Sequence, residues 1–106
     1  MNNHMYLYNT TFAADEALAD KLTLWLKHQF IPEATGEGSP MHSPSLLRIA
    51  AQHEPGTVSL ALHMYADSTD DINDWYADCG NGLFAQILEQ WQGRVVFFST
   101  TLEVLL

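Results

Sequence analysis

Three residues near the middle of the chain carry groups that could do chemistry together. His63 can act as a general base near neutral pH, and Arg48 can hold a carboxylate or an enolate oxygen. Tyr65 can add a hydrogen bond. His63 and Arg48 are therefore the candidate catalytic residues, although no motif in the sequence fixes a reaction. In the alternative interpretation, Arg48 pairs with Glu103 across a dimer and His63 packs beside Tyr65.

Metal and cofactor sites are not indicated by the remaining polar residues. Aspartates crowd residues 67–78, and Asp70, Asp74 and Asp78 share a helix spacing, but no glycine-turned calcium loop accompanies them. A solvated face near a helix N-terminus explains them better. The five histidines show no HxxxH or HxH spacing, and Cys79 fits a packed thiol rather than a nucleophile. The sequence thus predicts no metal and no cofactor.

The charge of the chain excludes two classes of partner. Four basic residues stand against 13 acidic ones, for a net charge of −9. Phosphate backbones and anionic lipids would repel such a chain, so neither nucleic acid nor a membrane surface is expected. No apolar run approaches the roughly 20 residues of a membrane span, and a lone cysteine allows no internal disulfide. A reducing cytoplasm is the expected location.

The hydrophobic periodicity predicts one domain over residues 1–106 with the order β-α-β-β-α-β. Alternation between polar and apolar residues is cleanest over 57–66, and three- and four-residue spacing marks both helices. This order is the ferredoxin-like arrangement, an α+β fold with two helices on one face of a four-stranded antiparallel sheet. The predicted strands cover residues 5–12, 45–52, 57–66 and 94–105, and the predicted helices cover 14–30 and 68–92.

Local signals set the expected ends of these elements. Pro32 should end the first helix, which makes residues 32–44 a long loop of the kind that often forms a lid. Ser68 and Asp71 have capping-box spacing. Gly80 and Gly82 predict a kink or a close contact inside the second helix. Residues 53–56 should form a turn, Gly93 should cap the second helix, and residues 1–4 should be a disordered extension.

Two helices leave one face of a four-stranded sheet uncovered, and that face is the expected site. Alternation places a half-polar, half-apolar set of side chains there: Asn9, Thr11, Arg48, Ala50, Ala61, His63, Tyr65, Phe97, Ser99, Thr101 and Glu103. Such a face suits two sheets that pair into a homodimer with a partly polar interior, although a simply solvated sheet remains the alternative. The candidate ligand-binding residues are Asn9, Arg48, His63, Tyr65, Phe97 and Glu103.

Several short motifs resemble a bacterial family of short uncharacterised proteins, a domain of unknown function common in Bacteroidetes. They are Tyr8-Asn9-Thr10-Thr11, Ile31-Pro32-Glu33, Leu46-Leu47-Arg48, Tyr65-Ala66-Asp67-Ser68 and Thr101-Leu102-Glu103-Val104. The family is similar to the dimeric α/β-barrel group, which includes cofactor-free monooxygenases and muconolactone isomerases. Phe30 and His63 depart from the family pattern, which often has His and Gln at these positions.

Three functions follow from these expectations. The first is a homodimeric binding or regulatory module that holds a small, partly apolar ligand against the uncovered face. The second is a cofactor-free oxygenase or isomerase that uses His63 and Arg48. The third is a structural or interaction protein whose dimer interface is filled by side chains.

Overall fold

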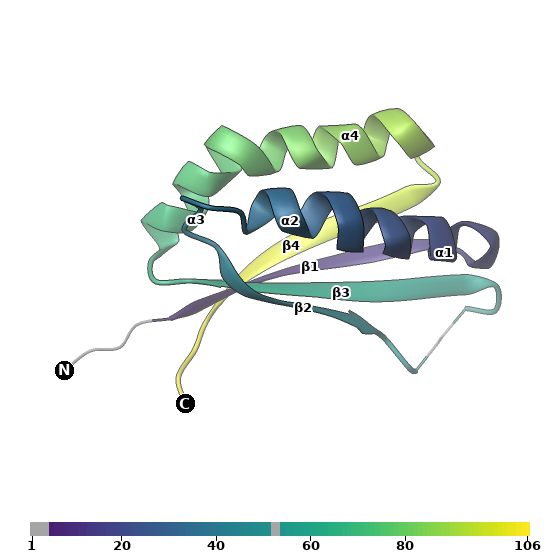
Figure 1. Ribbon diagram of the computed structural model, residues 1–106. Helices are drawn as coiled ribbons and strands as arrows, with labels where there is room; N and C mark the ends of the chain where they lie inside the picture. The colour runs from purple at the N-terminus through teal and green to yellow at the C-terminus, as the bar shows by residue number, and fades with distance from the viewer. Residues whose placement is uncertain (1–4, 52–53) are drawn as a thin grey trace.

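The computed structural model describes residues 5–51 and 54–106 and confirms the ferredoxin-like α+β fold (Figure 1). The predicted extension 1–4 and part of the predicted turn 53–56 lie outside the described residues. The elements are β1 (Tyr6–Asp15), α1 (Glu16–Trp25), η1 (Leu26–Phe30), α2 (Ile31–Ala34), β2 (His42–Arg48), β3 (Thr57–Ala66), α3 (Thr69–Trp75), η2 (Tyr76–Gly80), α4 (Asn81–Trp91) and β4 (Val95–Glu103). The segments η1 and η2 are single π-helical turns.

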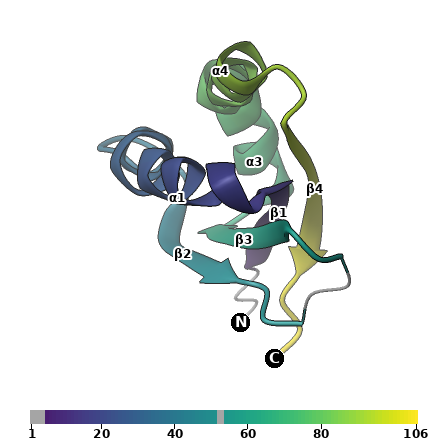
Figure 2. The same ribbon diagram turned by 90° about the vertical axis from the view of Figure 1, so that its right-hand side faces the viewer.

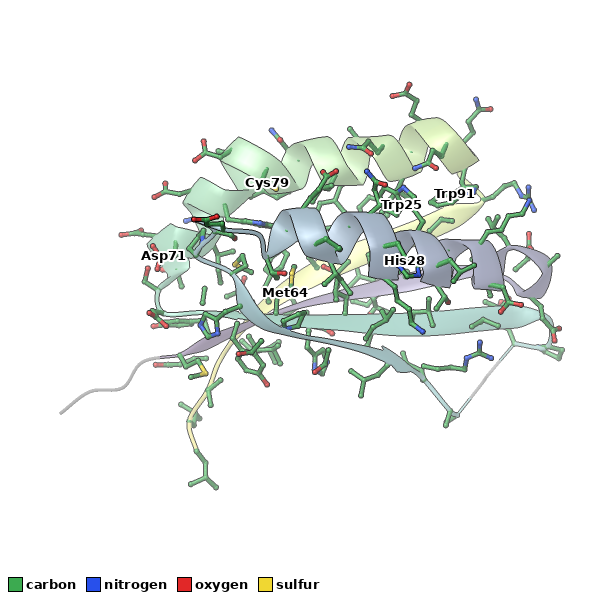
Figure 3. All side chains as sticks on the ribbon, viewed as in Figure 1. Trp25, His28, Met64, Asp71, Cys79 and Trp91 are labelled. Atoms are coloured by element: carbon green, nitrogen blue, oxygen red, sulfur yellow. The ribbon has the colours of Figure 1, made fainter. Side chains whose placement is uncertain are left out.

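The strands form one antiparallel sheet in the order β2-β3-β1-β4. All helices lie on one face of this sheet, which leaves the other face uncovered (Figure 2). Met64 of β3 is buried and points toward the helices, and Trp25 and Trp91 lie between α1 and α4 (Figure 3). The rings of those two tryptophans meet edge to face with centroids 5.6 Å apart. The core is therefore a single layer between sheet and helices.

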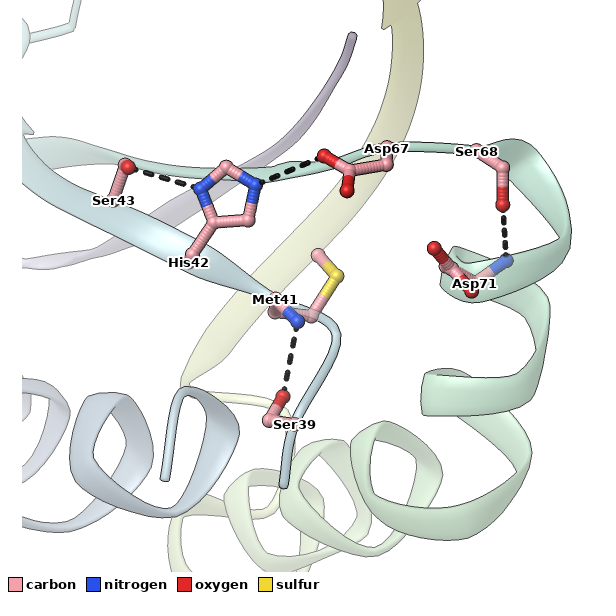
Figure 4. Close-up of polar contacts among 7 residues, drawn as sticks. All are labelled: Ser39, Met41, His42, Ser43, Asp67, Ser68 and Asp71. Carbon is pink, nitrogen blue, oxygen red and sulfur yellow. Dashed lines mark hydrogen bonds and ion pairs between the residues drawn. The ribbon is translucent and has the colours of Figure 1, made fainter. Parts of the chain in front are cut away.

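Side-chain caps start both helical runs. Asp15 accepts a hydrogen bond from the Leu18 backbone N–H at 2.9 Å. Ser68 accepts one from the Asp71 N–H at 3.0 Å, which confirms the predicted cap (Figure 4). Each cap satisfies a backbone donor that has no partner within the helix. β1 extends to Asp15, past the predicted strand end at residue 12, so the first helix begins two residues later than expected.

The prediction that Pro32 ends the first helical run was wrong, because the run continues to Ala34. The Ile31 N–H bonds to the Leu26 carbonyl five residues back, which makes the turn before Pro32 a π turn. A helical proline ring clashes with the carbonyl four residues back, and the wider π turn relieves that clash.

The predicted 32–44 loop is consequently shorter at both ends, and only residues 35–41 separate α2 from β2. The Ser39 hydroxyl donates to the Ala34 carbonyl at 2.6 Å. It also accepts from the Met41 N–H at 3.0 Å (Figure 4). Pro44 lies inside β2, where a bulge follows His42 and Ser43 adopts a φ of 55°. An edge strand tolerates a proline at a bulge because no ladder bond is needed there.

Close packing inside the second helical run confirms the expectation for Gly80. A Cβ at Gly80 would lie 2.5 Å from the Trp75 ring, whereas a Cβ at Gly82 would meet nothing within 4 Å. We therefore expect Gly80→Ala to lower the free energy of unfolding by about 1–3 kcal/mol through overpacking. Gly82→Ala, the matched control, should raise it by up to about 1 kcal/mol because alanine favours helix. Urea unfolding measures both, and equal effects of the two substitutions would contradict this packing.

Candidate functional site

The register of the sheet sorts the side chains of the uncovered face into four ranks across the strands. Directly opposed residues of an antiparallel pair point to the same side of the sheet. From β2 to β4, the first rank is Ile49, Ser59, Ala13 and Val96, and the second is Leu47, Ala61, Thr11 and Phe98. The third is Ser45, His63, Asn9 and Thr100, and the fourth is His42, Tyr65, Leu7 and Leu102. These four ranks are called the outer face below.

Large apolar side chains are exposed on the outer face. Val96 and Phe98 of β4 keep 60% and 63% of their surface accessible, and Leu47 and Leu102 are also exposed. None of the residues in the four ranks is Asp, Glu, Lys or Arg, in a chain that carries 13 acidic residues. Full charges begin beyond the ranks, where the Arg94 guanidinium lies 3.3 Å from an Asp15 carboxylate oxygen. An uncharged centre with a charged rim is the composition of an interface.

The third rank, here called the polar rank, crosses the middle of this apolar surface. Its members, Ser45, His63, Asn9 and Thr100, supply neutral donors and acceptors side by side. The Asn9 amide donates to the Thr11 hydroxyl at 3.4 Å. His63 is half-buried between Asn9 on β1 and Ser45 on β2. The rank can orient a polar group of a ligand, and His63 can accept a proton.

Three of the predicted site residues come together and three do not. Asn9, His63 and Tyr65 share the outer face, as the alternation in β1 and β3 predicts. The placement of Arg48 on that face was wrong: it lies opposite Leu60, which is buried beneath the helices. Leu46, two residues earlier, packs against the core, so the same side of β2 carries Arg48 at its exposed end. Arg48 therefore does not join His63.

The placement of Phe97 and Glu103 on the outer face was also wrong. The Phe97 ring stacks on Phe84 with centroids 5.0 Å apart and contacts Phe12 at 6.0 Å. Glu103 lies opposite Tyr6 and so points to the helix side of the sheet. The side chains that do occupy the outer face of β4 are Val96, Phe98, Thr100 and Leu102. The signal that could have given the facing of β4 was Val95, the first residue of the strand, which packs beneath the helices.

A hollow lies over the first rank, where residues 49–51 leave the end of β2. This hollow, named the hairpin hollow, has a volume of about 730 Å³. Most of its lining is small or apolar, and one ion pair stands at its rim. The lining residues are Ala13, Ala14, Asp15, Ile49, Ala51, Glu54, Thr57, Ser59, Arg94 and Val96. None of the predicted ligand-binding residues lines it.

Several other polar contacts among the described residues connect neighbouring segments of the fold. Asp67 lies 3.5 Å from one ring nitrogen of His42, and Ser43 contacts the other at 3.0 Å (Figure 4). The Trp75 indole donates to the Ala34 carbonyl at 3.0 Å, which ties the end of the first helical run to the second. Within residues 5–51 and 54–106, no group of three potential ligands is placed to hold a metal ion. No helix in that part is long and apolar enough to cross a membrane.

Comparison with known proteins gives the family. One family model, described as a domain of unknown function (DUF4286), matches residues 5–105. The chain belongs to the DUF4286 family. This confirms the expected membership of a family whose function is unknown. No match was found among curated proteins.

Solved structures show the same fold at low identity. A candidate antibiotic biosynthesis monooxygenase from Deinococcus radiodurans is 19% identical with a TM-score of 0.70, over 95% of this chain and 93% of that one. An ethyl tert-butyl ether d (ethd) family protein from Bacillus halodurans is 13% identical with a TM-score of 0.70, over 95% and 99%. A dimeric ferredoxin-like protein from an uncultured marine organism is 8% identical with a TM-score of 0.52, over 97% of both chains. At these identities the structural likeness establishes only the fold of this DUF4286 member.

Cys79 gives a test of the local electrostatics between the two helical runs. Partial burial, and then the carboxylates of Glu33 and Asp78, raise the pKa of its thiol above the ordinary value. Since only the thiolate reacts, iodoacetamide should modify Cys79 several-fold more slowly at pH 8 than a cysteine in an unstructured peptide. Asp78→Asn should speed the reaction and Asp70→Asn should not. A pH midpoint of alkylation at or below that of the free peptide would contradict the raised pKa.

Proposed function

We propose that this protein is a homodimer whose two outer faces pack together, and that it binds a small, partly apolar ligand against the polar rank. The observation that carries the proposal is how polar and apolar side chains are distributed between the two sides of β4. Its large apolar side chains, Val96, Phe98 and Leu102, point away from the helices. Of its polar side chains, Ser99, Thr101 and Glu103 point to the helix side and Thr100 points outward. A strand that served only the core of one chain would not expose such large apolar side chains on its other face.

Charge repulsion limits which surfaces of two such chains can meet. Each copy carries a net charge of −9, so two copies repel each other over most of their surface. The outer face lacks full charges within its four ranks and exposes several large apolar side chains. Monomers rarely leave a contiguous apolar patch of this kind uncovered. The dimeric ferredoxin-like protein of the same fold is consistent with this arrangement.

The polar rank is the reason to expect a ligand within the dimer. Packed sheets lie about 10 Å apart, which would remove Asn9, His63 and Thr100 from bulk water. Buried polar groups without partners cost free energy, so these groups need hydrogen bonds from a ligand or from trapped water. The apolar ranks on both sides would hold the apolar body of that ligand. Tyr65, in the next rank, adds a further hydroxyl.

A cofactor-free oxygenase or isomerase is the second candidate, and the position of His63 favours it. His63 is the one side chain of the polar rank with a ring nitrogen that can serve as a general base. Arg48 points to the other side of the sheet and cannot hold an oxyanion beside it. If a converted ligand is found, His63→Ala should abolish turnover while binding persists. Unchanged turnover in that variant would exclude His63 as the base.

Dimerisation can be tested with a charge placed on the outer face. Phe98→Asp should raise the dimer dissociation constant at least a hundredfold, because an unpaired carboxylate would be buried at the interface. Leu24→Asp is the matched control, since Leu24 is 56% exposed on α1 on the helix side. Light scattering after size exclusion at several concentrations measures both. Equal dimer content in the two variants would contradict the proposed interface.

Ligand binding can be tested without knowing the natural ligand. A thermal-shift screen of small apolar compounds that carry one hydrogen-bonding group should yield compounds that raise Tm. The double variant Asn9→Leu, His63→Leu should lose at least tenfold in affinity for them, because each lost hydrogen bond costs about 1 kcal/mol or more. His28→Leu, an exposed histidine on η1, is the control. Undiminished binding by the double variant would place the ligand elsewhere.

A further inference from the structure

Two segments project from the sheet on the side away from the helices, at opposite ends of the outer face. One is segment 49–51, which follows β2 and borders the hairpin hollow. The other is segment 104–106, which follows β4. Both views of the ribbon show them on the same side of the sheet (Figures 1 and 2).

The hairpin hollow lies beside segment 49–51, and segment 104–106 carries exposed leucines. The hairpin hollow measures about 730 Å³, a size that accepts a small ligand or several side chains. Ala13, Ile49, Ala51 and Val96 make its lining largely apolar. Asp15 and Arg94 in the lining form an ion pair at 3.3 Å, and Glu54 adds a carboxylate. The apolar part of the lining is suited to an apolar occupant.

Segment 104–106 supplies exposed apolar side chains. The Val104 N–H donates to the Met5 carbonyl at 2.9 Å, which continues the pairing of β4 with β1 and fixes where the segment leaves the sheet. Leu105 is 87% exposed and Leu106 is fully exposed. Burying each leucine would be favourable by roughly 1.5–3 kcal/mol.

We infer that in the homodimer Leu105 and Leu106 of each copy occupy the hairpin hollow of the other copy. This inference rests on the dimer proposed above. A two-fold axis between the packed sheets can run along the strands or across them. An axis along the strands would place the hollow of one copy opposite the hollow of the other, and the leucines of one copy opposite those of the other. An axis across the strands sets the leucines of one copy over the hollow of the other, at both ends at once.

Disulfide cross-linking between copies tests the arrangement. In a Cys79→Ala background, Ile49→Cys combined with Leu105→Cys should give a covalent dimer on a non-reducing gel after treatment with oxidised glutathione. Ile49 lies in the same rank as Val96 at the start of β4, whereas Leu105 lies beyond the end of β4, so the two sites cannot bridge within a chain. Each single variant should remain largely uncrosslinked. Efficient cross-linking by Leu105→Cys alone, or none by the pair, would overturn the inference.

Light scattering on the same proteins separates this inference from the dimer proposal. A dimer without the Ile49 to Leu105 cross-link would overturn the inference and leave the dimer standing. A monomer at all concentrations would overturn both.

A second variant measures what the leucines contribute. Leu105→Ser with Leu106→Ser should raise the dimer dissociation constant at least tenfold, because four leucines per dimer lose their burial. Leu24→Ser with Leu88→Ser, two exposed leucines of the helix side, should leave it unchanged. Circular dichroism checks that each variant is folded. An unchanged dissociation constant in the first variant would show that a ligand or solvent, and not the partner's leucines, fills the hollow.

Discussion

The register between β1 and β4 determines which side chains of the last strand meet the helices. Pairing along both strands sets this register, and a hydrogen bond of 2.8 Å between the hydroxyls of Thr10, which is fully buried, and Ser99 supports it. Ser99 also hydrogen-bonds Tyr8, whose pKa is raised mainly by burial and partly lowered by that contact. A slip of one residue would break these contacts and unstack Phe97 from Phe84. The same register turns Val96 and Phe98 outward, so a stable core and an apolar outer face arise together.

The space between the helices and the sheet is closely packed. Within the residues that the structure describes, every buried side-chain nitrogen and oxygen has a hydrogen-bond partner. The indole of Trp75 satisfies a carbonyl at the end of α2, and the missing side chain of Gly80 makes room for the ring of that tryptophan. Aromatic rings fill the space between these helices and the sheet.

The sequence was sufficient for the order of elements and for local features that depend on few residues. The alternation over 57–66, the Ser68 cap and the contact at Gly80 all follow from spacing or from the absence of a side chain. The prediction that the first helical run ends at Pro32 failed because a π turn, which depends on packing, accommodates the proline ring. The facing of β2 and β4 was missed because runs such as Val95-Val96-Phe97-Phe98 are apolar on both sides. In such a strand only the pairing register decides which side chains face the helices, and that register comes from contacts between residues far apart in the sequence.

The central claim is that a second copy of this chain covers the outer face. Sedimentation equilibrium of the unmodified protein over a wide range of micromolar concentrations tests it most directly, because it needs neither a variant nor a ligand. The account predicts a mass of twice one chain that falls toward the monomer only on dilution. A mass of one chain at every concentration would contradict it, and the exposed Val96, Phe98 and Leu102 would then require another explanation.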